Sequence, residues 1–214
     1  MTSDPNSDSP ALEHPDPHRY RSLAPCAPKG ALDLAALLTG QGPIELEIGF
    51  GHGQFLYERG RAVPDARIVG LEVKKKWATL VAERCVRRGL GNVTAWSDDA
   101  RQLLPRIAEA SVQRVFMHFP DPWWKRRHDK RRLTGDTLLD EIARVLVTGG
   151  EFFMQTDVPD RVEIHLAAIA AHGSFVPGGE GGRLDSNPYQ ARSNREARAE
   201  LDGLPVYRTL AIKR

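Results

Sequence analysis

Short apolar runs alternate with amphipathic stretches along the chain from Pro43 onward. The apolar runs have the length of strands and are rich in Val, Ile, Leu and Phe, which is typical of strands buried in a sheet. They predict strands at residues 44–48, 66–73, 92–96, 112–119, 151–156 and 206–213. Between them, apolar residues recur three and four positions apart and predict helices at 54–61, 74–88, 100–107 and 161–171. One more helix has its apolar face at 138–146 and is expected to stop at Gly149-Gly150.

This alternation predicts an α/β fold with a doubly wound, mostly parallel sheet. Strands joined through helices pair in parallel, and their right-handed crossovers place helices on both faces. The last strand is expected to be antiparallel, and residues 177–200, which hold many Gly, Arg and polar groups, are expected to form a long loop. In such sheets ligands bind beyond the carboxyl ends of the strands. The residues at those ends therefore indicate the function.

The composition is that of a globular protein. The chain has 214 residues, of which 41% are hydrophobic and 27% charged. That length fits one domain, which we expect over residues 18–214. Residues 1–17 are rich in Pro, Ser and Asp and contain no Lys or Arg, so we expect a disordered acidic tail there.

Several classes of protein are disfavoured by what the sequence lacks. No apolar run is long enough to span a bilayer, and the N-terminus lacks the apolar core of a secretory signal. Two cysteines, Cys26 and Cys85, exclude a disulfide framework and a cysteine-cluster zinc site. His52, His118 and His128 show no metal-ligand spacing, so packing or surface roles are expected for them. We expect a cytoplasmic monomer or homodimer with no membrane or metal partner.

A glycine-rich turn follows the first strand. Gly49, Gly51 and Gly53 stand at every second position, which lets the backbone turn tightly and approach a ligand. The dinucleotide fingerprint requires a further glycine where this chain has Gln54, so NAD is disfavoured. Glu47, just before the turn, could instead hold a cationic amine. A plain strand–helix turn is the alternative.

Acidic residues follow the second and third strands. Glu72 stands near the offset of about 20 residues at which an acid accepts hydrogen bonds from ribose hydroxyls. Asp98 or Asp99 could accept a hydrogen bond from an adenine amine. The alternatives are a surface glutamate at 72 and a helix cap at 98–99.

The stretch after the fourth strand, FPDPWWKRRHDKRRL at 119–133, combines a constrained acid, two tryptophans and six cations. The prolines on either side of Asp121 restrict its backbone, which holds its carboxylate in a fixed direction. Tryptophan faces suit stacking on nucleobases, and the cations suit phosphates. The net charge of only +2 therefore hides one strongly basic segment. A solvated basic loop with core tryptophans is the alternative.

This segment closely resembles the FPDPWxKxRHxKRR signature of bacterial tRNA (guanine-N7-)-methyltransferases. LEIGFGHG, GLEV and QTD at 155–157 are similar to that family's other motifs and occur in the same order. The resemblance implies a Rossmann-like sheet that binds S-adenosyl-L-methionine. It also implies methyl transfer to N7 of guanine at position 46, in the variable loop of tRNA, which forms 7-methylguanosine.

The resemblance also implies roles for individual residues. Asp121 corresponds to the catalytic acid, which also contacts the cofactor. Further cofactor contacts fall on Glu47, Gly49, Gly51, Gly53, Glu72 and Asp99. Contacts with the tRNA fall on Lys125, Arg127, Lys130, Arg131, Arg132, Asp157, Ser193 and Glu196. The family's Thr-Lys-Phe/Tyr-Glu motif corresponds to Ser193-Asn194-Arg195-Glu196, in which only the glutamate is identical.

The implied chemistry needs no general base, because guanine N7 has a free lone pair and no proton. Asp121 is therefore expected to stabilise the shift of charge or to hold the guanine, and not to remove a proton. One alternative is an S-adenosylmethionine-dependent methyltransferase that acts on another RNA, a protein or a small molecule. A non-catalytic RNA-binding module and, less favoured, an NAD enzyme are the others.

Overall fold

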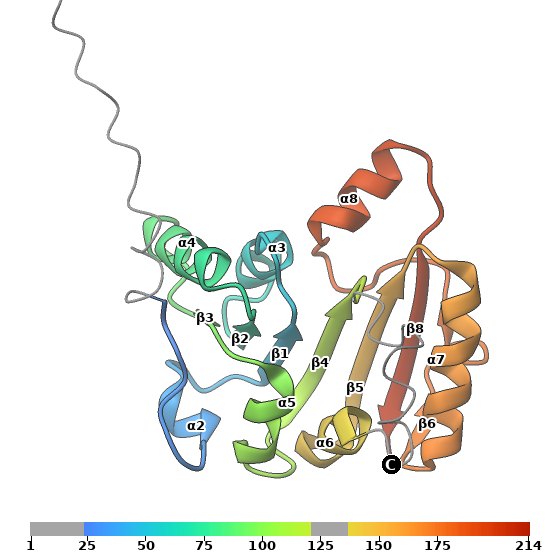
Figure 1. Ribbon diagram of the computed structural model, residues 1–214, viewed down its shortest axis with the longest axis horizontal. Helices are drawn as coiled ribbons and strands as arrows, with labels where there is room; N and C mark the ends of the chain where they lie inside the picture. The colour runs from blue at the N-terminus through green and yellow to red at the C-terminus, as the bar shows by residue number, and fades with distance from the viewer. Residues whose placement is uncertain (1–23, 121–136) are drawn as a thin grey trace, which may run out of the picture.

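A computed structural model describes residues 24–120 and 137–214 (Figure 1). Its centre is one eight-stranded sheet with the order β3-β2-β1-β4-β5-β8-β6, in which β7 also pairs with β8. The expected tail at 1–17 and the basic stretch from Asp121 to Leu133 lie outside the described residues. The strands are β1 (Ile44–Ile48), β2 (Arg67–Leu71), β3 (Val93–Trp96), β4 (Val112–His118), β5 (Leu146–Thr156), β6 (Phe175–Pro177), β7 (Arg183–Leu184) and β8 (Tyr207–Lys213).

The sheet has the predicted mixed polarity. The five strands β3, β2, β1, β4 and β5 pair in parallel, so their carboxyl ends meet along one edge (Figure 1). β8 runs antiparallel to β5, to β6 and to β7. The predicted antiparallel C-terminal strand is thus confirmed, and it lies inside the sheet between β5 and β6.

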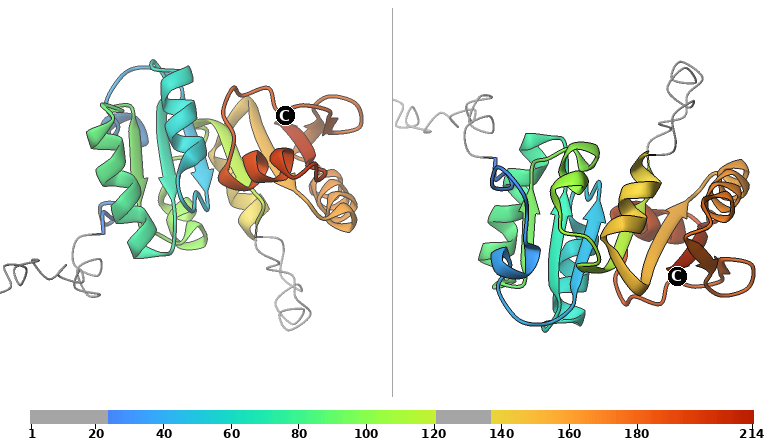
Figure 2. Two further views of the ribbon diagram at one scale, coloured as in Figure 1. Left: turned by 90° about the horizontal axis from the view of Figure 1, so that it is seen from above. Right: turned by 90° about the horizontal axis from the view of Figure 1, so that it is seen from below.

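Helices lie on both faces of the sheet, as the two views of Figure 2 show. The bounds are α2 (Leu34–Leu37), α3 (Gln54–Ala62), α4 (Lys75–Arg87), α5 (Ala100–Leu103), the 3₁₀ turn η1 (Leu104–Arg106), α6 (Thr137–Val145), α7 (Pro159–His172) and α8 (Asn194–Leu201). α3 and α4 pack with β2 and β3 through one buried cluster that includes Leu56, Ile68 and Val81. A second cluster joins the opposite face to α5, α6 and α7 and includes Leu46, Leu103 and Ile142.

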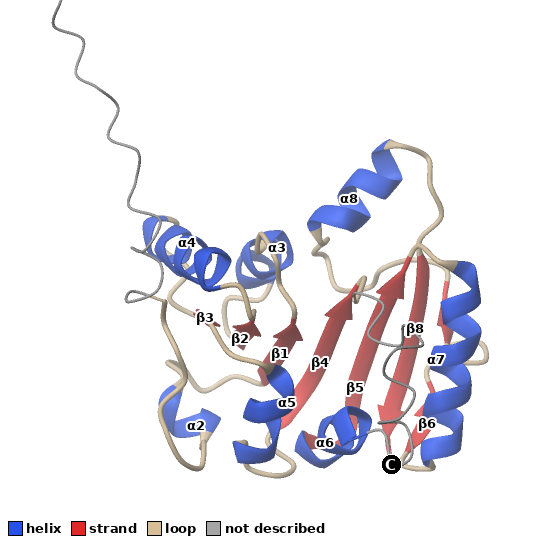
Figure 3. Ribbon diagram, in the orientation of Figure 1, coloured by secondary structure: helices blue, strands red, loops and turns tan. Residues whose placement is uncertain are grey.

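Two segments differ from the sequence prediction. β5 begins at Leu146 and passes through Gly149-Gly150, where the glycines were expected to separate helix from strand. The pairing of β4 with β5 shifts register there, and Gly149 has a φ of +76°, so the glycines allow an irregularity within the strand. Residues 177–200 were predicted to be a loop, but they contain β7 and most of α8, which Figure 3 shows as a helix.

Helix α8 forms without an apolar stripe. Its buried residues are Glu196 and Ala199, and Ser193 caps its first turn by accepting a hydrogen bond from the Glu196 N–H. A Ser followed three positions later by Glu is the capping-box pattern, and this signal was present in the sequence. None of the described helices is both long and apolar enough to cross a bilayer.

Candidate active site

The glycine turn between β1 and α3 is the centre of the candidate site. The N–H of Gly49 donates to the carbonyl of Leu71 at 2.8 Å, which ties the turn to the end of β2. Gly49, Gly51 and Gly53 have φ values of +77°, +53° and +76°, a region that other residues adopt only with strain. A Cβ at Gly49 or Gly51 would meet nothing within 4 Å, so this surface of the turn is open to a ligand.

Glu72, directly after β2, binds the backbone of the glycine turn through its carboxylate. Its Oε2 accepts the Gly51 N–H at 3.0 Å, and its Oε1 accepts the Lys74 N–H at 2.9 Å. The residue is only 8% exposed, so the alternative interpretation of Glu72 as a solvated surface glutamate is wrong. The carboxylate therefore helps to hold the glycine turn in shape.

The two aspartates after β3 have different partners. Asp99 caps α5 by accepting the Arg101 N–H at 3.0 Å, which confirms the capping interpretation. Arg101 also pairs with this carboxylate at 2.9 Å, and hydrogen bonding from Arg101 lowers the pKa of Asp99. Asp98 accepts the Ala27 N–H at 2.8 Å and so anchors the chain before α2.

Glu47, on β1, is a buried carboxylate paired with a histidine. Its Oε1 lies 2.9 Å from Nδ1 of His118, on the neighbouring strand β4. Glu47 is only 1% exposed, and burial raises its pKa, while the hydrogen bond from His118 acts in the opposite direction. Among the described residues, Oε2 of Glu47 has no hydrogen-bond partner. An acceptor in that position suits a cationic or hydrogen-bond-donating ligand.

Gln155, on β5, extends the Glu47–His118 pair into a row of three buried polar side chains. Gln155 pairs in register with His118, and the two residues therefore project from the same face of the sheet. Within the described part of the chain, neither polar atom of the Gln155 amide has a hydrogen-bond partner, and neither does Nε2 of His118. Buried groups of this kind are rare in folded proteins unless water or a ligand satisfies them.

A ring of charged side chains lies beside this row. Arg59, from α3, donates to both carboxylate oxygens of Glu45 at 2.8 and 2.7 Å, and to the carbonyl of Tyr189 at 2.7 Å. Arg114 bridges Glu45 at 3.0 Å and Glu151 at 2.7 Å. The Tyr189 hydroxyl closes the ring on Glu151 at 3.1 Å. The ring therefore connects the segment before α8, through Tyr189, to α3 and β1.

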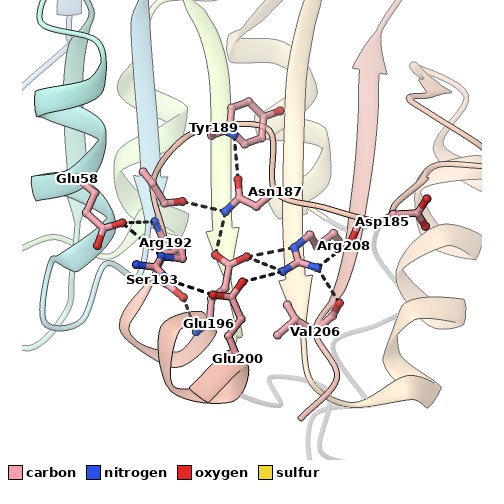
Figure 4. Close-up of polar contacts among 11 residues, drawn as sticks. Glu58, Asp185, Asn187, Tyr189, Arg192, Ser193, Glu196, Glu200, Val206 and Arg208 are labelled. Carbon is pink, nitrogen blue, oxygen red and sulfur yellow. Dashed lines mark hydrogen bonds and ion pairs between the residues drawn. The ribbon is translucent and has the colours of Figure 1, made fainter. Parts of the chain in front are cut away.

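The α8 region is held together by Glu196, as Figure 4 shows. Both oxygens of this fully buried carboxylate are engaged, because Oε2 accepts from Asn187 at 2.8 Å and Oε1 accepts from Arg208 at 2.9 Å. The Glu58 carboxylate on α3 accepts the Arg192 N–H at 2.7 Å. Within the described structure, Ser193 thus caps α8, and Glu196 connects this helix to Asn187 and Arg208.

The strand-end residues predicted from sequence come together at one edge. Glu47 lies near the end of β1, Glu72 and Asp99 follow the neighbouring parallel strands β2 and β3, and Asp157 follows β5. α8, which carries Glu196 and is capped by Ser193, stands over the ends of β4 and β5 (Figures 1 and 2). The predicted residues outside the described structure are Asp121, Lys125, Arg127, Lys130, Arg131 and Arg132.

Three residues in or beside this row were given no ligand-binding role from sequence. His118 was expected to have a packing or surface role, and Gln155 and Arg59 were not assigned one. Their contacts depend on which strands are neighbours and on a contact between residues as distant as Arg59 and Tyr189. For His118 and Gln155, the sequence signal was a polar residue within an otherwise apolar strand, at the end where ligands bind.

Comparison with known proteins places the chain in a family. A family model described as "Putative methyltransferase" matches residues 41–209. The tRNA (guanine-N(7)-)-methyltransferase of Myxococcus xanthus is 39% identical over 173 residues, which cover 80% of this chain and 84% of that protein. That of Anaeromyxobacter dehalogenans is 38% identical over 173 residues, with 80% and 86% covered. This chain belongs to the tRNA (guanine-N(7)-)-methyltransferase family.

Solved structures with the same fold include other members of the wider methyltransferase class. The 16S rRNA methyltransferase KamB superposes with a TM-score of 0.62 at 17% identity, covering 89% of this chain and 99% of that one. An S-adenosylmethionine-dependent O-methyltransferase from Thermotoga maritima gives 0.55 at 20% identity, covering 84% and 63%. These likenesses confirm the predicted doubly wound, Rossmann-like methyltransferase fold.

Proposed function

We propose that this family member transfers a methyl group from S-adenosyl-L-methionine to N7 of guanine 46 in the variable loop of tRNA. The observation that carries the proposal is its identity of 38–39% to tRNA (guanine-N(7)-)-methyltransferases over most of both chains. The open glycine turn and the acids at the strand ends support it, because they lie where sheets of this kind bind their ligands.

The residues around the turn fit the cofactor chemically. When bound, S-adenosyl-L-methionine supplies an electrophilic methyl group on a sulfonium and also carries an ammonium. Glu47 offers a buried acceptor oxygen with no partner among the described residues, which suits the ammonium. Glu72 would accept from the ribose hydroxyls in addition to its backbone donors, and Asp98 or Asp99 would accept from the adenine amine. Gly49, Gly51 and Gly53 would let the backbone approach the ligand closely.

Catalysis in this proposal is mainly positional. Guanine N7 would attack the methyl carbon in line with the sulfur–methyl bond, which breaks and leaves its electron pair on sulfur, so no side chain would have to remove a proton. Holding the reacting atoms about 3–3.5 Å apart removes roughly 7–11 kcal/mol of the barrier. We assign Asp121 to the catalytic position because the prolines at 120 and 122 restrict its backbone. Its carboxylate would hold the guanine or stabilise the charge that develops there.

Binding of the tRNA is assigned to two groups of residues. The cations Lys125, Arg127, Lys130, Arg131 and Arg132 would contact phosphates, which suits their spacing along the basic stretch. Asp157 would accept hydrogen bonds from the edge of the guanine. Ser193 and Glu196 stay predicted substrate contacts, and the internal bonds of both indicate that they also shape α8.

The proposal is tested by nucleoside mass spectrometry. An unmodified tRNA transcript incubated with the protein and S-adenosylmethionine is expected to yield 7-methylguanosine. A transcript with adenosine at position 46, or with 7-deazaguanosine there, is expected to yield none. Equal yield from the adenosine-46 transcript would disprove the position, and a different methylated product would point to another acceptor.

The role of Asp121 is tested separately. Asp121→Ala should depress turnover strongly while S-adenosylmethionine still binds, as followed by calorimetry. Near-normal turnover in this variant would remove Asp121 from the catalytic role without affecting the assignment of the reaction.

A further inference from the structure

Glu47 and His118 form a buried acid–histidine pair at the edge where the cofactor is proposed to bind. Both side chains are 2% exposed, and Glu47 Oε1 lies 2.9 Å from His118 Nδ1. Because a carboxylate can only accept, Nδ1 carries the hydrogen of this bond when Glu47 is ionised. The bond leaves the second carboxylate oxygen of Glu47 without a partner among the described residues.

Two cationic side chains close to this pair have other partners. Arg59 makes its ion pair with Glu45, and Arg114 pairs with Glu45 and Glu151. The nearby carboxylate of Glu72 carries the same charge as Glu47 and raises the pKa of Glu47 further. His118 is therefore the described neighbour that favours the ionised form of Glu47 and fixes the direction of its carboxylate.

The histidine ring is itself held firmly. It lies 4.3 Å from the ring of Phe55, on α3, and is stacked on that of Phe116 at 6.1 Å with an interplanar angle of 14°. The ring of Phe153, on β5, packs against it edge-on at 6.1 Å. Three aromatic rings from three elements thus restrict the rotation of the imidazole, which makes it a rigid donor.

We propose that His118 is a positioning residue, which aims Oε2 of Glu47 at the ammonium group of the bound cofactor. The assignment rests on the proposed contact between Glu47 and that ammonium. A preorganised acceptor binds a charged donor more tightly than a rotating one, because the ordering of the side chain is complete before the ligand arrives. The predicted packing role of His118 is retained alongside this one.

Comparing the binding of two ligands distinguishes a positioning role of His118 from a general loss of structure. S-adenosylhomocysteine carries the ammonium, whereas 5′-methylthioadenosine has the same nucleoside and thioether without it. In calorimetry, His118→Phe, which keeps an aromatic ring but has no donor, is expected to weaken S-adenosylhomocysteine about tenfold or more. Binding of 5′-methylthioadenosine is expected to stay within about twofold of the parent. His118→Asn, whose amide can donate from a similar place, should recover most of the lost affinity.

Controls distinguish this inference from the assignment on which it rests. Glu47→Gln should weaken S-adenosylhomocysteine selectively, and if it does not, the assignment of Glu47 to the ammonium fails. If Glu47→Gln weakens binding and His118→Phe does not, only the role of His118 fails. Equal losses of both ligands in His118→Phe, or no recovery in His118→Asn, would also overturn it. His165→Asn changes another buried histidine, on α7, and should leave both affinities unchanged.

Discussion

Arg195 of α8 donates from both Nε and Nη2 to Oδ2 of Asp157, at 2.9 and 2.6 Å. Asp157 follows β5, and the same guanidinium lies 5.5 Å from the ring centre of Phe119, which follows β4. One side chain therefore connects α8 to the ends of two neighbouring strands. The cation also contacts an acid that is proposed to hold the guanine.

Arg195→Ala is expected to impair use of the tRNA without unfolding the protein. The side chain of Arg195 is 59% exposed and that of Asp157 is 25% exposed, so loss of the pair should cost about 1 kcal/mol or less of unfolding free energy. The KM for tRNA should rise severalfold while the affinity for S-adenosylmethionine stays constant. Arg198→Ala is the matched control and should leave KM unchanged, because Arg198, on the same helix, pairs with the C-cap residue Asp202. Equal KM values for the two variants would argue against this role.

Arg59→Met is expected to destabilise the fold, because it removes a cation from the buried charge ring. Breaking a buried ion pair costs about 3–5 kcal/mol, and the remaining contact of Glu45 with Arg114 favours the lower end. The surface pair of Arg87 with Glu83 provides the control, and Arg87→Met should cost less than about 1 kcal/mol. Urea unfolding measures both values, and a loss in Arg59→Met as small as in the control would refute the prediction.

Gly53→Ala is expected to be strongly destabilising for two reasons. The φ of +76° costs a residue with a Cβ about 1–2 kcal/mol, and the added carbon would lie 2.7 Å from Val81 Cγ1 on α4. Gly91→Ala is the control, since a Cβ there would meet nothing within 4 Å. Thermal unfolding should show a clear fall in Tm for the first variant and almost none for the second. Similar Tm values for both would contradict the geometry of the turn.

The buried His165 is expected to make stability depend on pH. Burial, reinforced by the charge of Arg161, lowers the pKa of His165 from 6.5 to about 4. Between these values the unfolded chain binds a proton that the folded one excludes, so stability falls as the pH falls from 6.5 to 4. The loss of unfolding free energy is at most about 3 kcal/mol; it is absent above pH 6.5 and complete below pH 4. His165→Asn should flatten this slope in urea unfolding across the range, and an unchanged slope would exclude His165 as its source.

Binding of tRNA is expected to weaken steeply with salt. Each phosphate that is neutralised contributes a slope of about 0.7–0.9 in a plot of log affinity against log salt. Arg131→Ala should therefore reduce the slope by about 1 as well as the affinity. Filter binding at several salt concentrations measures both. An affinity that does not change with salt would contradict the phosphate role of the basic stretch.

The sequence predicted best what local pattern determines. β1 has the predicted limits, because its apolar run ends at a glycine turn. α8 was missed because its stability comes from the Ser193 cap and from ion pairs around Glu196, and an apolar period cannot reveal these. The interruption at Gly149-Gly150 was interpreted as a boundary, although a glycine pair also permits a bulge.

The relations across the candidate site depend on the order of the strands. The sequence indicated Glu47, Glu72 and Asp99 as ligand-facing acids, because each lies at or just beyond the carboxyl end of a strand. The pairing of Glu47 with His118 could not be predicted, because it requires β1 and β4 to be neighbours although β2 and β3 lie between them in the chain. The contact of Arg59 with Tyr189 is equally long-range.

The interior place of β8 has a consequence for how the protein is made. β6 is synthesised before β8, but among the described strands it pairs only with β8, from Phe175 to Pro177. β5 likewise cannot pair with β8, its second neighbour in the sheet, until residues 207–213 leave the ribosome. The nascent chain therefore exposes one edge of β5 until residues 207–213 have been synthesised, and a chain that stops before Tyr207 leaves that edge open to aggregation.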